Sequence, residues 1–356
     1  MDRCKELMER LKGRGMNAAL ITSRVNRMYY SGFTGSAGAL FLSEDRRVLL
    51  TDFRYTIQAK EQTKGEFEIV EIPRGGVLEP LRSLLQKSGW TAPKVGFEEE
   101  TTTVAQFERL QELPCAFAGI SAEILACREI KSPEEAEKLQ RAQRTAEEAF
   151  GLLLPKLHEG ITERAAANEL IHLMRSCGAQ DVSFAPIVAS GPNGAMCHAE
   201  PGERAFQKGD LVVMDFGCIV DGYCSDMTRT IGVGTVTGQK REIYNIVLQA
   251  HEAALAAARP GLTGRELDAV ARRIIAENGY GDCFGHSLGH GFGLEIHEAP
   301  TAGPRSEQLL KAGMTVTIEP GIYVEGLCGV RIEDCCLLTE TGVRDFVTTP
   351  KELILI

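Results

Sequence analysis

The sequence predicts an α+β protein in two parts, a smaller α/β domain followed by a larger domain with an internal duplication. Three observations support this: alternating short strand and helix patterns up to residue 127, a strong helix start near residue 132, and two similar segments in the second half. A chain of 356 residues can hold two domains, at roughly 100–200 residues each. We therefore expect domains at residues 1–127 and 128–356.

The composition is that of an ordinary globular protein, with 44% apolar and 25% charged residues. A formal net charge of −10 argues against nucleic-acid binding, which usually needs a basic surface. We expect no signal peptide and no membrane span, because no stretch approaches ~20 apolar residues. The odd number of cysteines, 11, without paired CxxC motifs fits reduced thiols in the cytoplasm.

The first domain is expected to mix strands and helices. Apolar runs at residues 18–21, 39–42 and 48–50 are strand-like, and residues 80–85 have a helical pattern. The glycine-rich stretch at 31–38 lacks the spacing of a phosphate-binding loop, so we interpret it as a turn-rich connection. These patterns are typical of an α/β domain.

The second domain is expected to begin with a long helix. Ser132 is followed by Pro133 at the first helical position and by Glu135 three residues after the cap, which forms a capping box. The helical pattern continues towards Leu157. This start signal places the domain boundary just before it.

Two segments of the second domain resemble each other. Residues 160–164 and 261–265 each follow a long helical run, and each supplies a threonine cap for a second helix, at 165–174 and 266–276. Glycine-rich turns and β-rich sequence come after both helices. This order predicts a duplicated domain with pseudo-twofold symmetry, whose functional site lies where the halves meet.

Five residues of the second domain stand out as metal-ligand candidates because of where they occur. Carboxylates at the ends of buried strands cost several kcal/mol unless a cation offsets their desolvation. Four carboxylates and one imidazole are suitable ligands for two divalent metal ions. The five residues are Asp215, Asp226, His290, Glu319 and Glu333.

The spacing of these residues predicts how they come together. Asp215 and Asp226 flank a hairpin with Asp221-Gly222 at its turn, so paired strands would bring the two carboxylates side by side. Glu319 and Glu333 flank a similar segment. His290 lies between Gly289 and Gly291, in what we interpret as a loop that permits close backbone approach.

The sequence around these residues resembles the pita-bread metallopeptidases, and in particular the Xaa-Pro peptidases prolidase and aminopeptidase P. The matching motifs lie at residues 190–198, 214–217, 225–230, 289–298, 317–323 and 330–334. The resemblance covers residues 129–356, and residues 27–35 and 51–55 resemble the creatinase/prolidase N-terminal domain. It implies a pita-bread catalytic domain that hydrolyses the bond before proline at the N-terminus of peptides or in Xaa-Pro dipeptides.

The resemblance implies a role for each of the five metal-ligand candidates. Asp215 would bind one metal ion, His290 and Glu319 the other, and Asp226 and Glu333 would bridge both. Metal ions ~3.5–4 Å apart can share a water and lower its pKa towards neutrality, which supplies the hydroxide that attacks the scissile carbonyl. The ligand set suits Mn, Co, Zn and Fe, and we place Mn first.

Further site residues follow from the same resemblance. Glu319 is the candidate for proton transfer, and His198 and His297 would hydrogen-bond the substrate or the oxyanion. His286 is expected to line the proline pocket. Arg331, two residues before Glu333 and so on the same strand face, is placed with the substrate-binding residues as a support for the carboxylates.

Several alternatives stay open at this point. The acidic residues could form a buried salt-bridge cluster, the three histidines outside the ligand set could be structural, and Arg331 could simply neutralise the acids. The chain could also be a non-catalytic peptide-binding module or a creatinase-like C–N hydrolase. Some prolidases carry an arginine where this chain has Thr301, with Arg305 further on, which tilts the prediction towards peptides longer than dipeptides. A homodimer is expected by analogy with the family.

Overall fold

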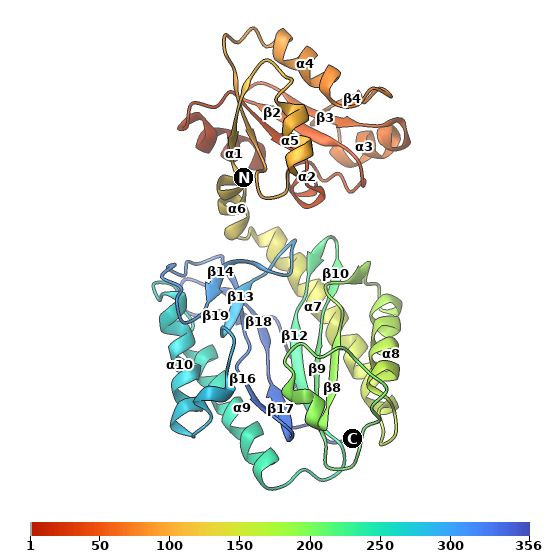
Figure 1. Ribbon diagram of the computed structural model, residues 1–356, viewed down its shortest axis with the longest axis vertical. Coiled ribbons are helices and arrows are strands. Elements are labelled where there is room, and N and C mark those ends of the chain that lie inside the picture. Colours follow the sequence, from red (N-terminus) through yellow and green to blue (C-terminus); the bar gives the residue numbers. More distant parts are fainter. Residues whose placement is uncertain (1) are drawn as a thin grey trace. The chain divides into compact units, whose positions relative to one another are not determined.

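A computed structural model describes residues 2–356, and the chain divides into two compact units, one ending at Arg128 and the other comprising Glu129–Ile356. Figure 1 shows the course of each unit. No helix in residues 2–356 is both long and apolar enough to cross a membrane.

The first unit is a six-stranded sheet with the strand order β4-β3-β2-β1-β5-β6. β1, β2 and β3 pair antiparallel, whereas β4, β5 and β6 join the sheet in parallel register. The predicted strands at 18–21, 39–42 and 48–50 are β1, β2 and β3. The strands are β1 (Ala18–Ile21), β2 (Ala39–Ser43), β3 (Arg47–Thr51), β4 (Glu68–Glu71), β5 (Lys94–Phe97) and β6 (Ala116–Gly119).

Helices connect the strands of this sheet, and the predicted helix at 80–85 lies within α4. Apolar side chains of α4 pack with those of β1, β2, β3 and β5 in one core cluster, which includes Leu81, Leu20 and Phe41. The helices are α1 (Arg3–Lys12), α2 (Arg24–Ser31), α3 (Thr56–Thr63), α4 (Leu78–Lys87), α5 (Val104–Leu110) and α6 (Ser121–Glu129).

The second unit opens with the expected long helix. Ser132 accepts a hydrogen bond from the Glu135 backbone N–H, and the Glu135 side chain accepts one from the Ser132 N–H, so the capping box is confirmed. A pair of helices then precedes the first β-rich segment. The elements are α7 (Pro133–Leu153), α8 (Glu163–Ser176), β7 (Asp181–Val182), β8 (Ile187–Ser190), β9 (Leu211–Phe216), β10 (Cys218–Val220), β11 (Tyr223–Cys224) and β12 (Met227–Gly232).

A second pair of helices and a second β-rich segment follow. In this half β15 pairs with β18, as β9 pairs with β12 in the first half. The elements are α9 (Gln239–Ala257), α10 (Gly264–Glu277), β13 (Gly289–Gly291), β14 (Glu298–Ala302), β15 (Thr315–Ile318), β16 (Gly321–Val324), β17 (Cys328–Arg331), β18 (Asp334–Leu338) and β19 (Val343–Asp345).

The two halves repeat the same hydrogen bonds, as the internal resemblance predicted. Thr162 and Thr263 cap α8 and α10, and each forms an isolated β-bridge with the strand-like segment ahead of β9 or β15. The paired bonds are Gly160 N to Phe206 O and Gly261 N to Leu310 O, then Phe206 N to Ile161 O and Leu310 N to Leu262 O. Figure 1 shows the two halves side by side, with α7 and α8 flanking one and α9 and α10 the other.

Candidate metal centre and active site

The four carboxylates among the five metal-ligand candidates occupy equivalent positions in the two halves. Asp215 lies in β9 and Asp226 directly precedes β12, while Glu319 directly follows β15 and Glu333 directly precedes β18. An isolated bridge between Thr228 and Glu333 joins the strands of the two halves. The duplicated fold therefore delivers two carboxylates from each half to the seam between them.

Local structure explains this convergence. The predicted turn between Asp215 and Asp226 is present, with Asp221 and Gly222 at φ +50° and +79°, values that suit a tight hairpin turn. The second carboxylate pair flanks the β16–β17 hairpin, in which Val324 pairs with Cys328. Each hairpin returns the chain so that its flanking carboxylates approach each other.

His290 is not in a loop, contrary to our expectation. It lies in the short strand β13, which pairs with β14 and has a register shift after His290. The glycines around it permit close packing, since a Cβ on Gly289 would lie 1.9 Å from the carbonyl oxygen of Thr317. The strand forms because β13 hydrogen-bonds to β14, a partner that glycine-rich sequence alone does not reveal.

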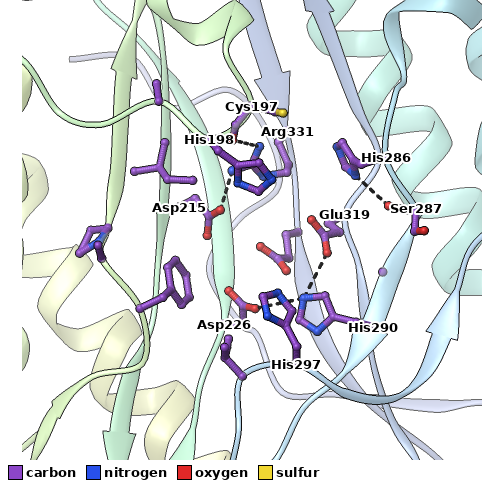
Figure 2. A pocket seen from close by; sticks show the side chains of 18 of the residues that line it. Cys197, His198, Asp215, Asp226, His286, Ser287, His290, His297, Glu319 and Arg331 are labelled. Carbon is purple, nitrogen blue, oxygen red and sulfur yellow. Dashed lines mark hydrogen bonds and ion pairs between the residues drawn. The ribbon is translucent and has the colours of Figure 1, made fainter.

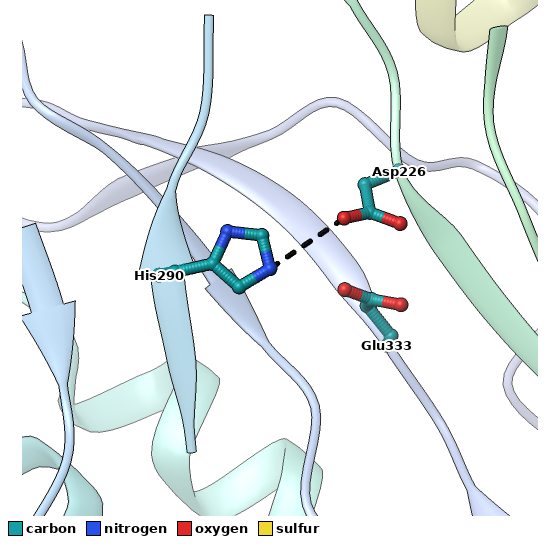
Figure 3. Close-up of side chains that lie close together, drawn as sticks. All are labelled: Asp226, His290 and Glu333. Atoms are coloured by element: carbon teal, nitrogen blue, oxygen red, sulfur yellow. Dashed lines mark ion pairs between the residues drawn. The ribbon is translucent and has the colours of Figure 1, made fainter. Parts of the chain in front are cut away.

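Three of the candidate side chains form a compact group that could hold a metal ion. One ligand atom from each of Asp226, His290 and Glu333 lies within 4.8 Å of the others, as Figure 3 shows. Nδ1 of His290 lies 3.0 Å from the carbonyl oxygen of Gly291, so it is the nitrogen that carries the proton. Nε2 therefore presents a lone pair to Asp226 Oδ2 at 3.7 Å and to Glu319 Oε1 at 3.4 Å.

The electrostatics of this group favour a bound cation. Burial raises the pKa of Asp226 and Glu333 well above the ordinary carboxyl value, and it raises the pKa of Glu319 to about 8. Burial lowers the pKa of His290 to about 4, which keeps the imidazole neutral. Oxygen and nitrogen lone pairs that face one another repel unless a cation or a proton lies between them, so the donor set fits divalent metal ions.

Arg331 is the cation that faces these acids, and its side chain is almost fully buried. It forms an ion pair with Asp215 Oδ2, and its other donors contact Thr228 Oγ1, the Tyr323 hydroxyl and the Cys197 carbonyl. Asp215 Oδ1 is buried without a hydrogen-bond partner among the described residues. The Arg331 guanidinium therefore pairs with one oxygen of the Asp215 carboxylate. Another cation is needed to balance the negative charge of the other acids.

Arg331 and Glu333 face the same cavity, as expected for residues two apart in extended chain, while Ile332 between them is buried in the hydrophobic core. Arg331 is the last residue of β17, and Glu333 lies between β17 and β18, where the chain changes sheet. Thr228 of β12 links the two side chains, because its Oγ1 accepts a hydrogen bond from Arg331 Nε and donates one of 2.7 Å to Glu333 Oε2.

The metal-ligand candidates line a cavity of about 510 Å³. His198 and His297 also line it and are solvent-exposed, and Figure 2 shows both beside the acids. The His297 ring lies 4.4 Å from the His290 ring, centroid to centroid. Both histidines are therefore accessible to a molecule in the cavity.

His286 also lines the cavity, but both of its ring nitrogens are engaged by the protein. Nδ1 lies 2.7 Å from the Ser287 carbonyl oxygen, and Nε2 lies 2.9 Å from the Tyr323 hydroxyl, which in turn accepts a hydrogen bond from Arg331. Burial lowers the pKa of His286 to about 4. The ring therefore presents a neutral edge to the cavity.

Sequence reasoning missed several residues of this site. Tyr323 links His286 to Arg331, and Thr317 donates to Glu319 Oε1 at 3.1 Å and accepts from the His290 backbone N–H. Both residues lie inside the motif at 317–323, so the sequence contained the information, but we assigned neither residue a role. The cavity also has apolar lining residues, namely Phe184, Ala185, Pro186, Ile187 and Ile296.

A second cavity of about 530 Å³ shares three lining residues with the first, namely His286, Ser287 and Thr301. Arg272 and Arg305 also line it. Arg272 forms an ion pair with Asp268, whereas Arg305 is exposed and has no ion pair with any residue of 2–356. The second cavity therefore adds a cationic side chain next to the first.

The protein families that match this chain divide it into the same two parts as the structure does. Residues 137–340 match the model of metallopeptidase family M24, and residues 3–130 match the creatinase/prolidase N-terminal domain. The chain is 37% identical to the Xaa-Pro dipeptidase of Pyrococcus furiosus, covering 99% of both chains.

Solved structures of the same two-domain organisation are also similar. The chain superposes on the Xaa-Pro dipeptidase from Bacillus anthracis with a TM-score of 0.96 at 41% identity, covering 100% of this chain and 99% of the other. The X-Pro aminopeptidase from Thermotoga maritima gives a TM-score of 0.94 at 38% identity, with full coverage of both chains.

Proposed function

The chain belongs to metallopeptidase family M24 and is an Xaa-Pro exopeptidase, and we propose that it works with two divalent metal ions. The observation that carries the metal proposal is the lone pair of the neutral His290 Nε2, which faces the buried carboxylates of Asp226 and Glu319. The ligands are Asp215, Asp226, His290, Glu319 and Glu333.

The division of these ligands follows their positions in the two halves. Asp226 and Glu333, which directly precede β12 and β18, would be shared by the two ions. Asp215 would help to hold one ion, and its Oδ1 is available for this because Oδ2 is held by Arg331. His290 and Glu319, whose Nε2 and Oε1 atoms lie 3.4 Å apart, would help to hold the other.

When bound, two such ions lower the pKa of a shared water and polarise the carbonyl before proline. His198 and His297 are exposed in the same cavity and donate hydrogen bonds to the carbonyl oxygen as negative charge develops on it. Glu319 accepts a proton from the attacking water and passes it to the leaving imino nitrogen. Thr317 holds the Glu319 carboxylate for this task.

Arg331 supports the metal-ligand carboxylates and lines the cavity that would receive the substrate. Its hydrogen bonds orient Asp215 and, through Thr228, Glu333. His286 forms part of the proline pocket with its neutral ring edge, together with apolar residues of the same cavity such as Phe184 and Ile187. A proline ring is apolar and has no N–H in an Xaa-Pro bond, so such residues suit it.

We favour peptides longer than dipeptides as substrates. Thr301 is a short side chain at the junction of the two cavities, so residues after proline have space to extend into the second cavity. Arg305 would meet the carboxylate of a short peptide there. Binding of dipeptides alone would instead call for a cation or a wall at the junction.

The identity of the metal, the cellular location and the oligomeric state are proposed from general arguments. Mn²⁺ is the preferred ion of a set that includes Co, Zn and Fe, because the ligands are mainly carboxylate oxygens. The eleven cysteines are free thiols, which is consistent with the reducing cytoplasm. A homodimer is proposed by analogy with the family.

Cleavage of Ala-Pro and Ala-Pro-Ala by metal-stripped protein, before and after addition of Mn²⁺ or Co²⁺, tests these proposals. We expect metal-restored cleavage of both peptides, with higher kcat/KM for the tripeptide. Cleavage of only the dipeptide would overturn the proposed substrate length. Cleavage of neither by folded, metal-loaded protein would favour a peptide-binding module, and turnover without metal would favour a creatinase-like hydrolase.

A further inference from the structure

Arg229 is a fully buried arginine that lies behind the candidate metal centre and outside its cavity. All five of its N–H donors have a suitable acceptor, which is the full capacity of a guanidinium. Four acceptors are backbone carbonyls and one is a carboxylate. They are Thr228 O at 2.9 Å, Glu333 O at 2.7 Å, Thr349 O at 2.8 Å, Pro350 O at 3.0 Å and Asp334 Oδ1 at 2.8 Å.

Two of these acceptors belong to the candidate metal centre. The carbonyl of Glu333 is the backbone of a proposed bridging ligand, and Thr228 is the residue whose hydroxyl donates to the Glu333 carboxylate. Arg229 therefore fixes Glu333 from its main chain while Thr228 fixes it from its side chain. Glu333 lines the cavity, whereas Arg229 and Thr228 do not.

Two other acceptors belong to the segment 349–356, which lies along β12. Gly232 N donates to Ile354 O at 2.8 Å, and Ile356 N donates to Gly232 O at 2.9 Å. The Tyr244 hydroxyl of α9 donates to Lys351 O at 2.6 Å. The segment is thus held both by Arg229 and by neighbouring elements of the same unit.

The charges around Arg229 are also balanced by this segment. Asp334 is completely buried and forms ion pairs with Arg229 at 2.8 Å and with Lys351 at 2.7 Å. Asp334 directly follows Glu333 in the chain. A change in the segment would therefore disturb the backbone on both sides of the Glu333 carbonyl.

We propose that Arg229 and the segment 349–356 form a clamp that positions Glu333 for metal binding. Arg229 is a positioning residue, because it touches neither substrate nor metal and acts through the main chain of a ligand. The inference rests on the proposed metal centre. It implies that the segment 349–356, which does not line the cavity, influences metal affinity.

Arg229→Lys tests the clamp, because lysine keeps the positive charge beside Asp334 but cannot bond five acceptors in one plane. We expect Mn²⁺ affinity, measured by calorimetry, to fall about 10- to 100-fold, as is usual when a group that orients a ligand is lost. The increase in Tm that saturating Mn²⁺ gives to the wild type should shrink accordingly.

Arg27→Lys is the matched control, since Arg27 is also buried and donates to three backbone carbonyls, those of Thr22, Gly35 and Gly38, in the first unit. It should lower the Tm of the metal-free protein but leave Mn²⁺ affinity unchanged. Unchanged affinity in Arg229→Lys would overturn the clamp. A wild type that binds no Mn²⁺ would instead overturn the metal proposal itself.

Hydrogen exchange of the wild type gives a second test that needs no variant. If the clamp aids metal binding, metal binding must stabilise the clamp by the same free energy. Mn²⁺ should therefore slow amide exchange in residues 228–233 and 349–356, relative to peptides from β1 to β3. Exchange in residues 349–356 that does not respond to Mn²⁺ would contradict the proposal.

Discussion

At the scale of single residues, the candidate site is an arrangement that is unfavourable without a cation. His290 donates through Nδ1 to the Gly291 carbonyl, which directs the lone pair of Nε2 towards Asp226 and Glu319. Asp215 keeps one buried oxygen without a hydrogen-bond partner among residues 2–356. Buried carboxylates cost free energy unless a cation offsets their desolvation, so four of them beside one imidazole in a single cavity indicate function rather than stability.

Asp226→Asn is expected to reduce metal content and abolish turnover. The amide removes the negative charge that would be shared between two cations while preserving the size of the side chain. Metal analysis of the purified variant, with turnover of Ala-Pro-Ala, checks this prediction. A variant that retained two metal ions and full activity would show that Asp226 is not a ligand.

His198→Ala is expected to lower kcat by about 10²-fold or more, the usual effect of losing one hydrogen bond to a developing oxyanion. Metal content should be unchanged, because His198 is not one of the five proposed ligands. His172→Ala is a suitable control, since His172 is exposed on α8 away from the cavity. An unaltered kcat would assign His198 a structural role.

At the scale of elements, glycines allow the strands that carry the ligands to pack closely. A Cβ on Gly289 would lie 1.9 Å from Thr317 O, and one on Gly329 would lie 1.8 Å from Gly194 O. Gly329 lies in β17, and Gly194 lies in a short 3-10 helix (Gly191–Ala195) before His198. Close backbone approach therefore sets the positions of both a metal ligand and a candidate catalytic histidine.

Gly289→Ala is expected to displace β13 and weaken metal binding, because the added methyl collides with the backbone of β15. The loss of stability should be about 1–3 kcal/mol, as for other overpacked sites. Gly285→Ala is the matched control, since a Cβ there meets no atom within 4 Å. Urea unfolding and Mn²⁺ titration of both variants measure the difference. Equal behaviour of the two variants would contradict this explanation.

At the scale of the whole molecule, the catalytic unit depends on a buried polar cluster as well as its apolar core. His251 is fully buried, and its Nε2 lies 3.3 Å from Asp334 Oδ2, with Arg229 and Lys351 facing the same carboxylate. Burial lowers the pKa of His251 from its ordinary value of 6.5 to about 4. The folded protein therefore binds this proton less readily than the unfolded chain does.

The resulting pH dependence of stability has a definite sign. Below pH 6.5 the unfolded chain protonates His251 while the folded protein does not, so stability should fall as the pH decreases towards 4. The contribution is at most about 1.4 kcal/mol per pH unit. His251→Gln removes this titration. Urea unfolding of metal-free wild type and variant at pH 7 and pH 5 should show a smaller loss for the variant, and equal losses would contradict the assignment.

The sequence by itself determined much of this protein. Caps at Ser132, Thr162 and Thr263 predicted helix starts because capping is a local hydrogen-bond pattern. Strand runs, the Asp221-Gly222 turn and the duplication were equally local or periodic signals. The motifs around the five metal-ligand candidates were sufficient to indicate the family, since a carboxylate at the end of an apolar strand is unusual wherever it occurs.

Only the tertiary structure decided how these pieces meet. It placed His290 in a strand, because β-pairing depends on a partner distant in the sequence. It joined Arg331 to Glu333 through Thr228 of another strand, a link that strand periodicity does not reveal. It also brought the segment 349–356 to Arg229. Such contacts between distant residues leave no periodic signal, because they arise from the packing of the two halves and not from local propensity.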